Sequence, residues 1–149
     1  MLNRGDHIPD VPLVNSDGST VLLGSLIDRP LVLFFYPKDN TPGCTAEACA
    51  FRDDYQAFVE AGADVIGVSS DDNQSHANFR ERHRLPYRLM SDPGGEARKA
   101  FGIPKTLGIL PGRATFVINR QGTILYAFNS QFAPERHVKN ALEALRVPT

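Results

Sequence analysis

The chain has 149 residues, 42% of them hydrophobic, which is enough for one well-packed domain and too few for two. We therefore expect residues 1–149 to form a single domain. The formal charge of -1 and the scattered lysines and arginines leave no basic surface for nucleic acid. No apolar stretch reaches the roughly 20 residues that span a bilayer. The N-terminus also lacks a signal-peptide core, so we expect no membrane partner and a cytoplasmic location.

The first half of the chain predicts a hairpin followed by a βαβ unit. Residues 11–14 and 21–23 flank an Asp-Gly turn, which is typical of a β-hairpin. Residues 31–36 and 63–69 are continuous apolar runs, as expected for parallel strands that are covered on both faces. The segment between these runs has apolar residues at helical spacing. They are Ala48, Phe51, Tyr55, Phe58 and Val59.

The second half predicts further helices and a second hairpin. In chain order we expect a polar helix over 72–84, a strand over 87–90, a short helix over 95–101, a loop over 102–112, strands over 114–119 and 123–128, and a final helix entered through Pro134. This order is typical of an α/β, thioredoxin-like fold. Its central mixed β-sheet is flanked by helices, here with an N-terminal β-hairpin and an inserted strand and helix.

The two cysteines, Cys44 and Cys49, lie where the first central strand is followed by a helix. Thr41 is a good N-cap residue, and Pro42 fits the first helical position. Cys44 then lies in the first helical turn, where unpaired N–H groups and the helix dipole favour a thiolate. Two neighbouring thiols in a reducing compartment are more often catalytic or metal-binding than a permanent crosslink, and this pair points to redox catalysis.

Helix geometry predicts that the two thiols are apart. At about 100° per residue, Cys44 shares the inward face with the apolar residues, and Cys49 is rotated about 140° from it toward polar positions. Five residues of helix rise about 7.5 Å, whereas a disulfide needs Cα atoms within roughly 4.4–6.8 Å. A bond between Cys44 and Cys49 therefore requires the start of the helix to unwind.

Three other interpretations of the pair remain open from the residues alone. Buried free cysteines are common in protein cores. A zinc site is disfavoured because no second cysteine pair or close histidine pair completes a tetrahedral ligand set. A thioredoxin-type exchanger would need the spacing Cys-x-x-Cys, which this pair of cysteines does not have. We expect no metal and no cofactor. The four dispersed histidines are His7, His76, His83 and His137.

Two motifs in the right order resemble the peroxiredoxins, which are thiol peroxidases with a thioredoxin-like fold. The first is Pro37-x-x-x-Thr41-x-x-Cys44, and the second is the segment Arg113-Ala-Thr-Phe-Val-Ile. A second cysteine five residues after the first resembles the bacterioferritin-comigratory-protein or PrxQ subgroup, the atypical class with an intramolecular disulfide. The resemblance extends over nearly the whole chain. It departs at Asn119, where many relatives carry Asp in a turn.

The resemblance implies roles for the matched residues. Cys44 would be the peroxidatic nucleophile, and Cys49 would resolve its sulfenic acid as an intramolecular disulfide. Arg113 would place a cation near the sulfur and the peroxide, although by itself it would be interpreted as a solvated loop arginine. The hydroxyl of Thr41 would either cap the helix or bind the sulfur and the peroxide.

Pro37 would complete the catalytic set, and three further residues would support it. Pro37 would shield the sulfur, and Pro42 fits the first position of the helix. The N–H groups of Gly43 and the following cysteine would hold a peroxide oxygen, as helix N-termini hold anions. Glu47 would either orient Arg113 or only interact with the helix dipole.

The resemblance also implies the partners of the reaction. The substrates would be hydrogen peroxide and organic hydroperoxides, and electrons would come from thioredoxin or a similar dithiol protein. The chain would act as a monomer in antioxidant defence and redox homeostasis. Two other classes of function stay open, namely a redox sensor or holdase and a thioredoxin-fold binding module with inert thiols.

Overall fold

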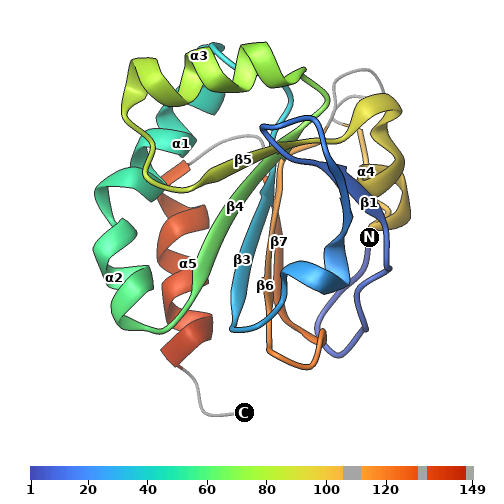
Figure 1. Cartoon of the computed structure of the whole chain (residues 1–149). Coiled ribbons are helices and arrows are strands. Elements are labelled where there is room, and N and C mark those ends of the chain that lie inside the picture. Colours follow the sequence, from blue (N-terminus) through green and yellow to red (C-terminus); the bar gives the residue numbers. More distant parts are fainter. Residues whose placement is uncertain (106–111, 131–133, 147–149) are drawn as a thin grey trace.

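The computed structural model describes residues 1–105, 112–130 and 134–146. In these residues, seven strands form one sheet in the order β2-β1-β5-β4-β3-β6-β7 (Figure 1). The strands are β1 (Pro12–Val14), β2 (Thr20–Leu22), β3 (Leu31–Phe35), β4 (Asp64–Ser69), β5 (Arg88–Ser91), β6 (Ala114–Ile118) and β7 (Ile124–Asn129). The α-helices are α1 (Pro42–Asp53), α2 (Tyr55–Glu60), α3 (Asn73–His83), α4 (Glu96–Ala100) and α5 (Pro134–Arg146).

The sheet is mixed, as the sequence predicts. Strand β3 pairs in parallel with β4 and antiparallel with β6, and β4 pairs in parallel with β5. The N-terminal hairpin of β1 and β2 joins the sheet through a pairing of β1 with β5. The central position of β3 matters for function, because the chain leaves the end of this strand to enter α1.

The core has one part on each face of the sheet. Side chains of β3 alternate between the two parts: Leu33 and Phe35 pack on one face, and Phe34 and Tyr36 on the other. Helices α1, α2, α3 and α5 contribute to the second part, which also contains Cys44 (Figure 1). Every residue from 31 to 36 is buried, which explains the continuous apolar run.

The predicted elements are present with small differences in their limits. The second strand of the first hairpin ends at Leu22, because Leu23 begins a short 3-10 helix, η1 (Leu23–Leu26). The helical segment after β3 is broken at Asp54, whose φ of −101° and ψ of 10° separate α1 from α2. Val59 in α2 is 45% exposed, so its place in the apolar pattern did not predict burial. Much of the predicted loop over 102–112 lies outside the described residues.

Among the described helices, none has both the length and the apolar character that crossing a membrane requires.

Candidate active site

The start of α1 places Cys44 in the core. Pro42 occupies the first turn, as predicted, and the Cys44 side chain is buried with 1% exposure. Thr41 has the extended backbone of an N-cap residue, with φ −91° and ψ 151°, but its side chain does not cap the helix. Its Oγ1 instead donates to the carbonyl of Lys38 at 2.9 Å. Of its two proposed roles, capping through the hydroxyl is therefore not observed.

Arg113, which immediately precedes β6, contacts the Cys44 sulfur. Its Nη2 donates to Sγ at 3.2 Å, and its Nη1 donates to Glu47 Oε1 at 2.8 Å. The arginine is 4% exposed, so it is not a solvated loop residue, which is how its type and position alone would be interpreted. A Cβ atom at Gly43 would lie 3.1 Å from Nη2, so the absence of a side chain there lets the guanidinium approach the sulfur.

The charge of Arg113 is maintained by its neighbours. Burial opposes the charged form, but the carboxylate of Glu47 and the sulfur of Cys44 more than offset this cost, and the pKa of Arg113 lies above its ordinary value. A permanent cation 3.2 Å from the sulfur stabilises the thiolate electrostatically. The sulfur is thus placed for nucleophilic chemistry.

Glu47 lies in α1, and its side chain is completely buried. Only one of its oxygens is well bonded: Oε1 accepts from Arg113, whereas Oε2 has no hydrogen-bond partner. Burial raises the pKa of Glu47 to about 7, although Arg113 acts in the opposite direction. Of the two roles predicted for Glu47, this geometry favours orientation of the arginine over a contact with the dipole alone.

His137 in α5 belongs to the same site and was not predicted. Its Nδ1 lies 2.7 Å from Thr115 Oγ1 and 3.4 Å from Glu47 Oε2, and its Nε2 lies 2.9 Å from the carbonyl of Ser130. Burial lowers the pKa of His137 to about 4. We call Glu47, Arg113, Thr115 and His137 the Glu47 cluster. One signal in the sequence could have indicated its burial: His137 directly precedes Val138, which belongs to the apolar face of the last helix.

A second buried cluster, also missed, holds the loop between β3 and α1. Asp39 accepts from the hydroxyls of Tyr36 at 2.5 Å and Ser75 at 2.8 Å, and His76 Nδ1 lies 2.8 Å from its Oδ2. The Asp39 N–H donates to Asp71 at 2.7 Å. We call Tyr36, Asp39, Ser75 and His76 the Asp39 cluster. It ties the loop that carries Pro37 and Thr41 to helix α3.

Arg98 in α4 is a second cation near the site that sequence reasoning did not identify. Its Nη1 donates to the carbonyl of Gly112, and its Nη2 donates to the carbonyl of Tyr36 at 3.0 Å. Burial lowers its pKa, and both Asp92 and the Cys44 sulfur act against this effect. Arg98 therefore connects the end of β3 to the segment that leads into Arg113.

Cys49 lies apart from Cys44, as the helix geometry predicts. Both are free thiols in one continuous helix, with Cys44 buried and Cys49 partly exposed. Cys49 opens onto a cavity of about 460 Å³ between α1 and α5, whose lining includes Asp53, Glu135 and Lys139. The resolving position is thus open to solvent while the predicted nucleophile is not.

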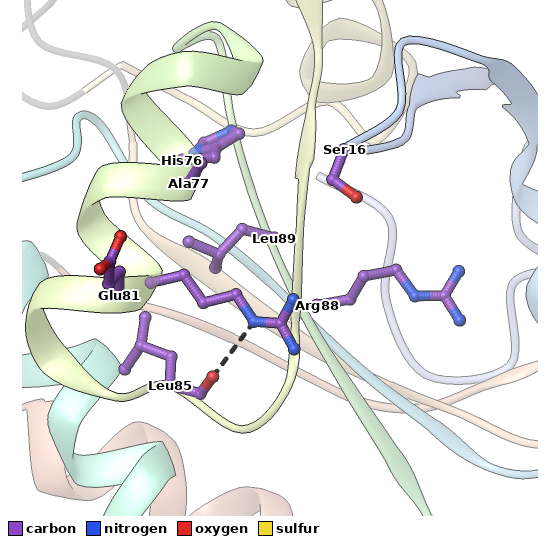
Figure 2. A pocket seen from close by; sticks show the side chains of 8 residues that line it. Ser16, His76, Ala77, Glu81, Leu85, Arg88 and Leu89 are labelled. Atoms are coloured by element: carbon purple, nitrogen blue, oxygen red, sulfur yellow. Dashed lines mark hydrogen bonds between the residues drawn. The ribbon is translucent and has the colours of Figure 1, made fainter.

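Another cavity, of about 390 Å³, lies between α3 and β5 (Figure 2). Its lining includes Ser16, Leu85, Arg88 and Leu89, and the dashed line in Figure 2 marks the bond that Arg80 Nε donates to the Leu85 carbonyl at 3.1 Å. Its lining does not include Cys44 or Arg113, so it is separate from the thiol site. Over the described ranges, no three His, Cys, Asp or Glu side chains are grouped so that they could hold a metal ion.

A thioredoxin-like sheet with a buried cysteine at a helix N-terminus and an arginine on its sulfur defines a thiol-dependent redox protein. The sequence profile of the AhpC/TSA family matches residues 4–127. Among curated proteins, the chain is 46% identical over 146 residues to peroxiredoxin Q, chloroplastic, of Oryza sativa subsp. japonica, covering 97% of this chain and 67% of the relative. The Arabidopsis thaliana protein of the same name is 47% identical, with 97% and 68% covered.

Solved structures agree with these relatives. The peroxidoxin BcpB of Mycobacterium tuberculosis has a TM-score of 0.89 and 39% identity, covering 98% of this chain and 97% of that one. A bacterioferritin comigratory protein of Xanthomonas campestris, described for its alkyl peroxide reduction activity, has a TM-score of 0.83 and 32% identity, with 95% and 98% covered. The chain belongs to the AhpC/TSA family, as a peroxiredoxin of the Q or bacterioferritin-comigratory type.

Proposed function

We propose that this chain is a peroxidase that reduces hydrogen peroxide and organic hydroperoxides through a sulfenic acid on Cys44. One observation carries the proposal: the buried Cys44 sulfur lies in the first turn of α1 with Arg113 Nη2 at 3.2 Å. A thiolate in this place has a fixed direction of attack and a cation beside the developing negative charge. Membership of the peroxiredoxins and the alkyl peroxide reduction described for the Xanthomonas protein support the same activity.

In the proposed first step, the Cys44 thiolate attacks one oxygen of the peroxide. The S–O bond forms as the O–O bond breaks, two electrons pass from sulfur to the peroxide, and the leaving alkoxide or hydroxide takes up a proton. Arg113 stabilises the leaving oxygen. The N–H groups of the first helical turn, which begins at Pro42 and includes Gly43, have no intrahelical acceptor and face this charge.

Thr41 and Pro37 complete the proposed peroxide site. Because Thr41 Oγ1 donates to the Lys38 carbonyl, its lone pairs remain available to accept the O–H of the peroxide. Pro37 is half-buried and has no N–H of its own, so it narrows the approach to the sulfur without adding a donor. These contacts would align the peroxide for attack.

In the proposed second step, Cys49 attacks the sulfenic sulfur and water leaves, which forms the Cys44–Cys49 disulfide. Both residues lie in α1, where five residues rise about 7.5 Å, beyond the roughly 6.8 Å limit for the Cα atoms of a disulfide. The first turns of α1 must therefore unwind in each cycle and form again on reduction.

We propose that thioredoxin or a similar dithiol protein reduces this disulfide and that the chain works as a single-domain monomer. The partly exposed position of Cys49 beside an open cavity supports access of a second protein. We propose a cytoplasmic location because a dithiol reductant requires a reducing compartment. The plant relatives are named as chloroplastic proteins, and fractionation of cells expressing the native gene tests this location.

Stopped-flow peroxide consumption with a complete thioredoxin system tests the activity. We expect sustained turnover for the unaltered protein and none for Cys44→Ser. Cys49→Ser should react once and stop with thioredoxin alone. A single stoichiometric oxidation of the unaltered protein would instead indicate a redox sensor, and thiols that do not react with peroxide would indicate a binding module. Mass mapping of the oxidised chain locates the disulfide.

Hydrogen exchange tests the conformational step separately. Forming the disulfide should increase the exchange of amides 44–52, because their helical hydrogen bonds are lost. The reduced chain and the reduced Cys49→Ser variant are matched controls and should keep this segment protected. Equal protection of a verified disulfide form would contradict the unwinding step.

A further inference from the structure

The contact between Glu47 and His137 lacks a proton. Glu47 Oε2 lies 3.4 Å from His137 Nδ1, and both side chains are 0% exposed. Oε2 has no other hydrogen-bond partner, although buried carboxylate oxygens are almost always bonded. Two acceptor atoms thus lie beside each other, both removed from the protein surface.

Counting protons in the Glu47 cluster leads to the same conclusion. His137 Nε2 lies 2.9 Å from the Ser130 carbonyl, which only accepts, so this nitrogen carries a hydrogen. The neutral ring then leaves Nδ1 as an acceptor, and the Thr115 hydroxyl, 2.7 Å away, is the donor beside it. Nothing donates to Glu47 Oε2. One additional proton on Oε2 removes the orphaned anion. It does not need Nδ1 as its acceptor, because the one lone pair of Nδ1 already receives the Thr115 hydroxyl.

We propose that Glu47 carries a proton on Oε2 while Cys44 is a thiolate, and that Glu47 loses this proton when Cys44 becomes a sulfenic acid. The proposal rests on the proposed function, because it assumes that Cys44 is the oxidised sulfur. It gives Glu47 a second role besides orienting Arg113. Glu47 is here a positioning residue that balances charge, and it does not touch the peroxide.

The reason is the number of buried charges around Arg113. The guanidinium contacts both the Cys44 sulfur and Glu47, and two anions beside one cation would leave an unpaired negative charge in the core. With Glu47 protonated, Arg113 and the thiolate form one neutral pair. After oxidation the sulfur is neutral, and Glu47 becomes the counterion of Arg113. The buried site stays neutral throughout.

The other groups that face Glu47 agree with this assignment. Burial raises the pKa of Glu47 to about 7, whereas burial lowers the pKa of His137 to about 4, so the proton belongs on the carboxyl group. The titratable or charged groups around the pair come from several elements. They are Cys44 on α1, Arg113 before β6, Tyr87 before β5, Arg98 on α4, and His137 and Arg136 on α5.

The proposed step balances as follows. Cys44–S⁻, ROOH and protonated Glu47 give Cys44–SOH, ROH and the Glu47 carboxylate. The S–O bond forms, the O–O bond breaks, sulfur is oxidised and the peroxide is reduced. The alkoxide gains one proton and Glu47 releases one, so the protein takes up no net proton from solution. Without a protonated Glu47, the same reaction consumes one proton from solution.

Proton counting in weakly buffered solution tests the proposal. The Cys49→Ser background keeps the sulfenic acid, and a pH-indicator dye reports proton uptake for each Cys44 oxidised once the reaction is complete. At about pH 6, about one unit below the pKa of Glu47, roughly nine-tenths of the Glu47 carboxyl groups carry the proton. We therefore expect uptake of only about 0.1 proton per sulfenic acid when Glu47 is present, and of about one proton in Glu47→Gln. Glu60→Gln, the same change at an exposed position of α2, should behave as the background protein.

Infrared difference spectra of the Cys49→Ser background provide a second readout that needs no Glu47 variant. The C=O band of a protonated carboxyl group should be present in the reduced protein and lost in the sulfenic acid form. A structural role of Glu47 alone would not produce this change.

The outcomes are distinguishable. Uptake of one proton with Glu47 present, or no loss of a carboxyl band when a verified sulfenic acid forms, overturns the inference and leaves the proposed function intact. Failure of Cys44 to form a sulfenic acid overturns both. Low uptake that depends on Glu47, together with loss of the carboxyl band, supports the inference.

Discussion

The protein contains two buried carboxyl–histidine pairs that are satisfied in opposite ways. Asp39 receives hydrogen bonds on both oxygens, from the hydroxyl of Tyr36 on Oδ1 and from that of Ser75 on Oδ2, and His76 Nδ1 lies 2.8 Å from Oδ2. Glu47 receives one, from Arg113 on Oε1, and its Oε2 receives none. Both oxygens of the first carboxyl group thus have donors, whereas only one oxygen of the second does.

The difference shows that two buried carboxyl groups can have very different sets of hydrogen-bond donors, which burial alone does not determine. Both side chains are almost fully buried, with Asp39 4% and Glu47 0% exposed. The well-bonded side chain of Asp39 ties the loop before α1 to α3, while the poorly bonded side chain of Glu47 contacts Arg113, which also contacts the Cys44 sulfur. By our proposal, the Asp39 cluster is structural, and the Glu47 cluster balances charge during the reaction.

The largest expected effect follows from removing the cation of the Glu47 cluster. In Arg113→Gln the sulfur loses its charged donor, and we expect the rate of Cys44 oxidation to fall by about 10²–10³-fold, as when one donor to a developing anion is removed. Stopped-flow measurement of the first oxidation checks this. Arg29→Gln, at an exposed arginine, is the control. A fall of less than about threefold would contradict the assigned role.

The Asp39 cluster should respond in stability. Asp39→Asn replaces one acceptor oxygen by an NH₂ group, which then faces hydroxyl groups that donate to Asp39. We therefore expect a loss of about 3 kcal/mol in the free energy of unfolding. Glu47→Gln should cost much less at pH below 7, because an amide mimics the protonated carboxyl group. Urea unfolding of the two variants measures the difference. Equal costs would remove the distinction between the clusters.

The pH dependence of stability should identify Glu47. Its pKa is raised from 4.5 to about 7, so its contribution is fully present below 4.5 and is lost as pH rises through about 7. At about 1.4 kcal/mol per pKa unit this loss amounts to about 3 kcal/mol. His137, lowered from 6.5 to about 4, acts in the opposite sense: its contribution is present above 6.5 and is lost as pH falls through about 4.

Urea unfolding of the reduced protein across this range measures the two slopes. Glu47→Gln should remove the decline between about pH 4.5 and 7 and leave the acid-side decline of His137 in place. Glu60→Gln serves as the control here too, because Glu60 is exposed. An unchanged decline in Glu47→Gln would show that another group is responsible.

The smallest effect is expected for Thr115→Val. This change removes the hydroxyl next to His137 Nδ1 and keeps the side-chain shape, so we expect a loss of about 1 kcal/mol. A double-mutant cycle with His137→Phe isolates the pair, and its coupling energy should account for most of that loss. Independent effects of the two changes would mean that the contact does not stabilise the fold.

The sequence predicted those features that depend on neighbouring residues. The apolar runs of β3 and β4 gave the central strands, Pro42 marked the first turn of α1, and the spacing of the cysteines predicted one inward and one partly exposed thiol. Such features follow from local periodicity and from the fixed geometry of a helix. The resemblance to peroxiredoxins then added Arg113, from a distant segment.

Other features were missed, some of them local and some that join distant parts of the chain. The Thr41 hydroxyl donates to the Lys38 carbonyl instead of accepting from a helix N–H, and nothing in the sequence distinguished these two hydrogen bonds. The break at Asp54 divides an apolar pattern that otherwise continues into α2. His76 and His137 were counted only as dispersed histidines, although each pairs with a buried carboxyl group.

The sequence by itself therefore determined where a reactive thiol can form: a cysteine in the first turn of a helix, with a second cysteine that cannot reach it while the helix is intact. Only the tertiary structure decided which charged groups surround that thiol. Glu47 and His137 are 90 residues apart, and packing of α5 against α1 brings them together away from water. Burial changes the protonation of a group through its surroundings, and those surroundings exist only in the folded chain.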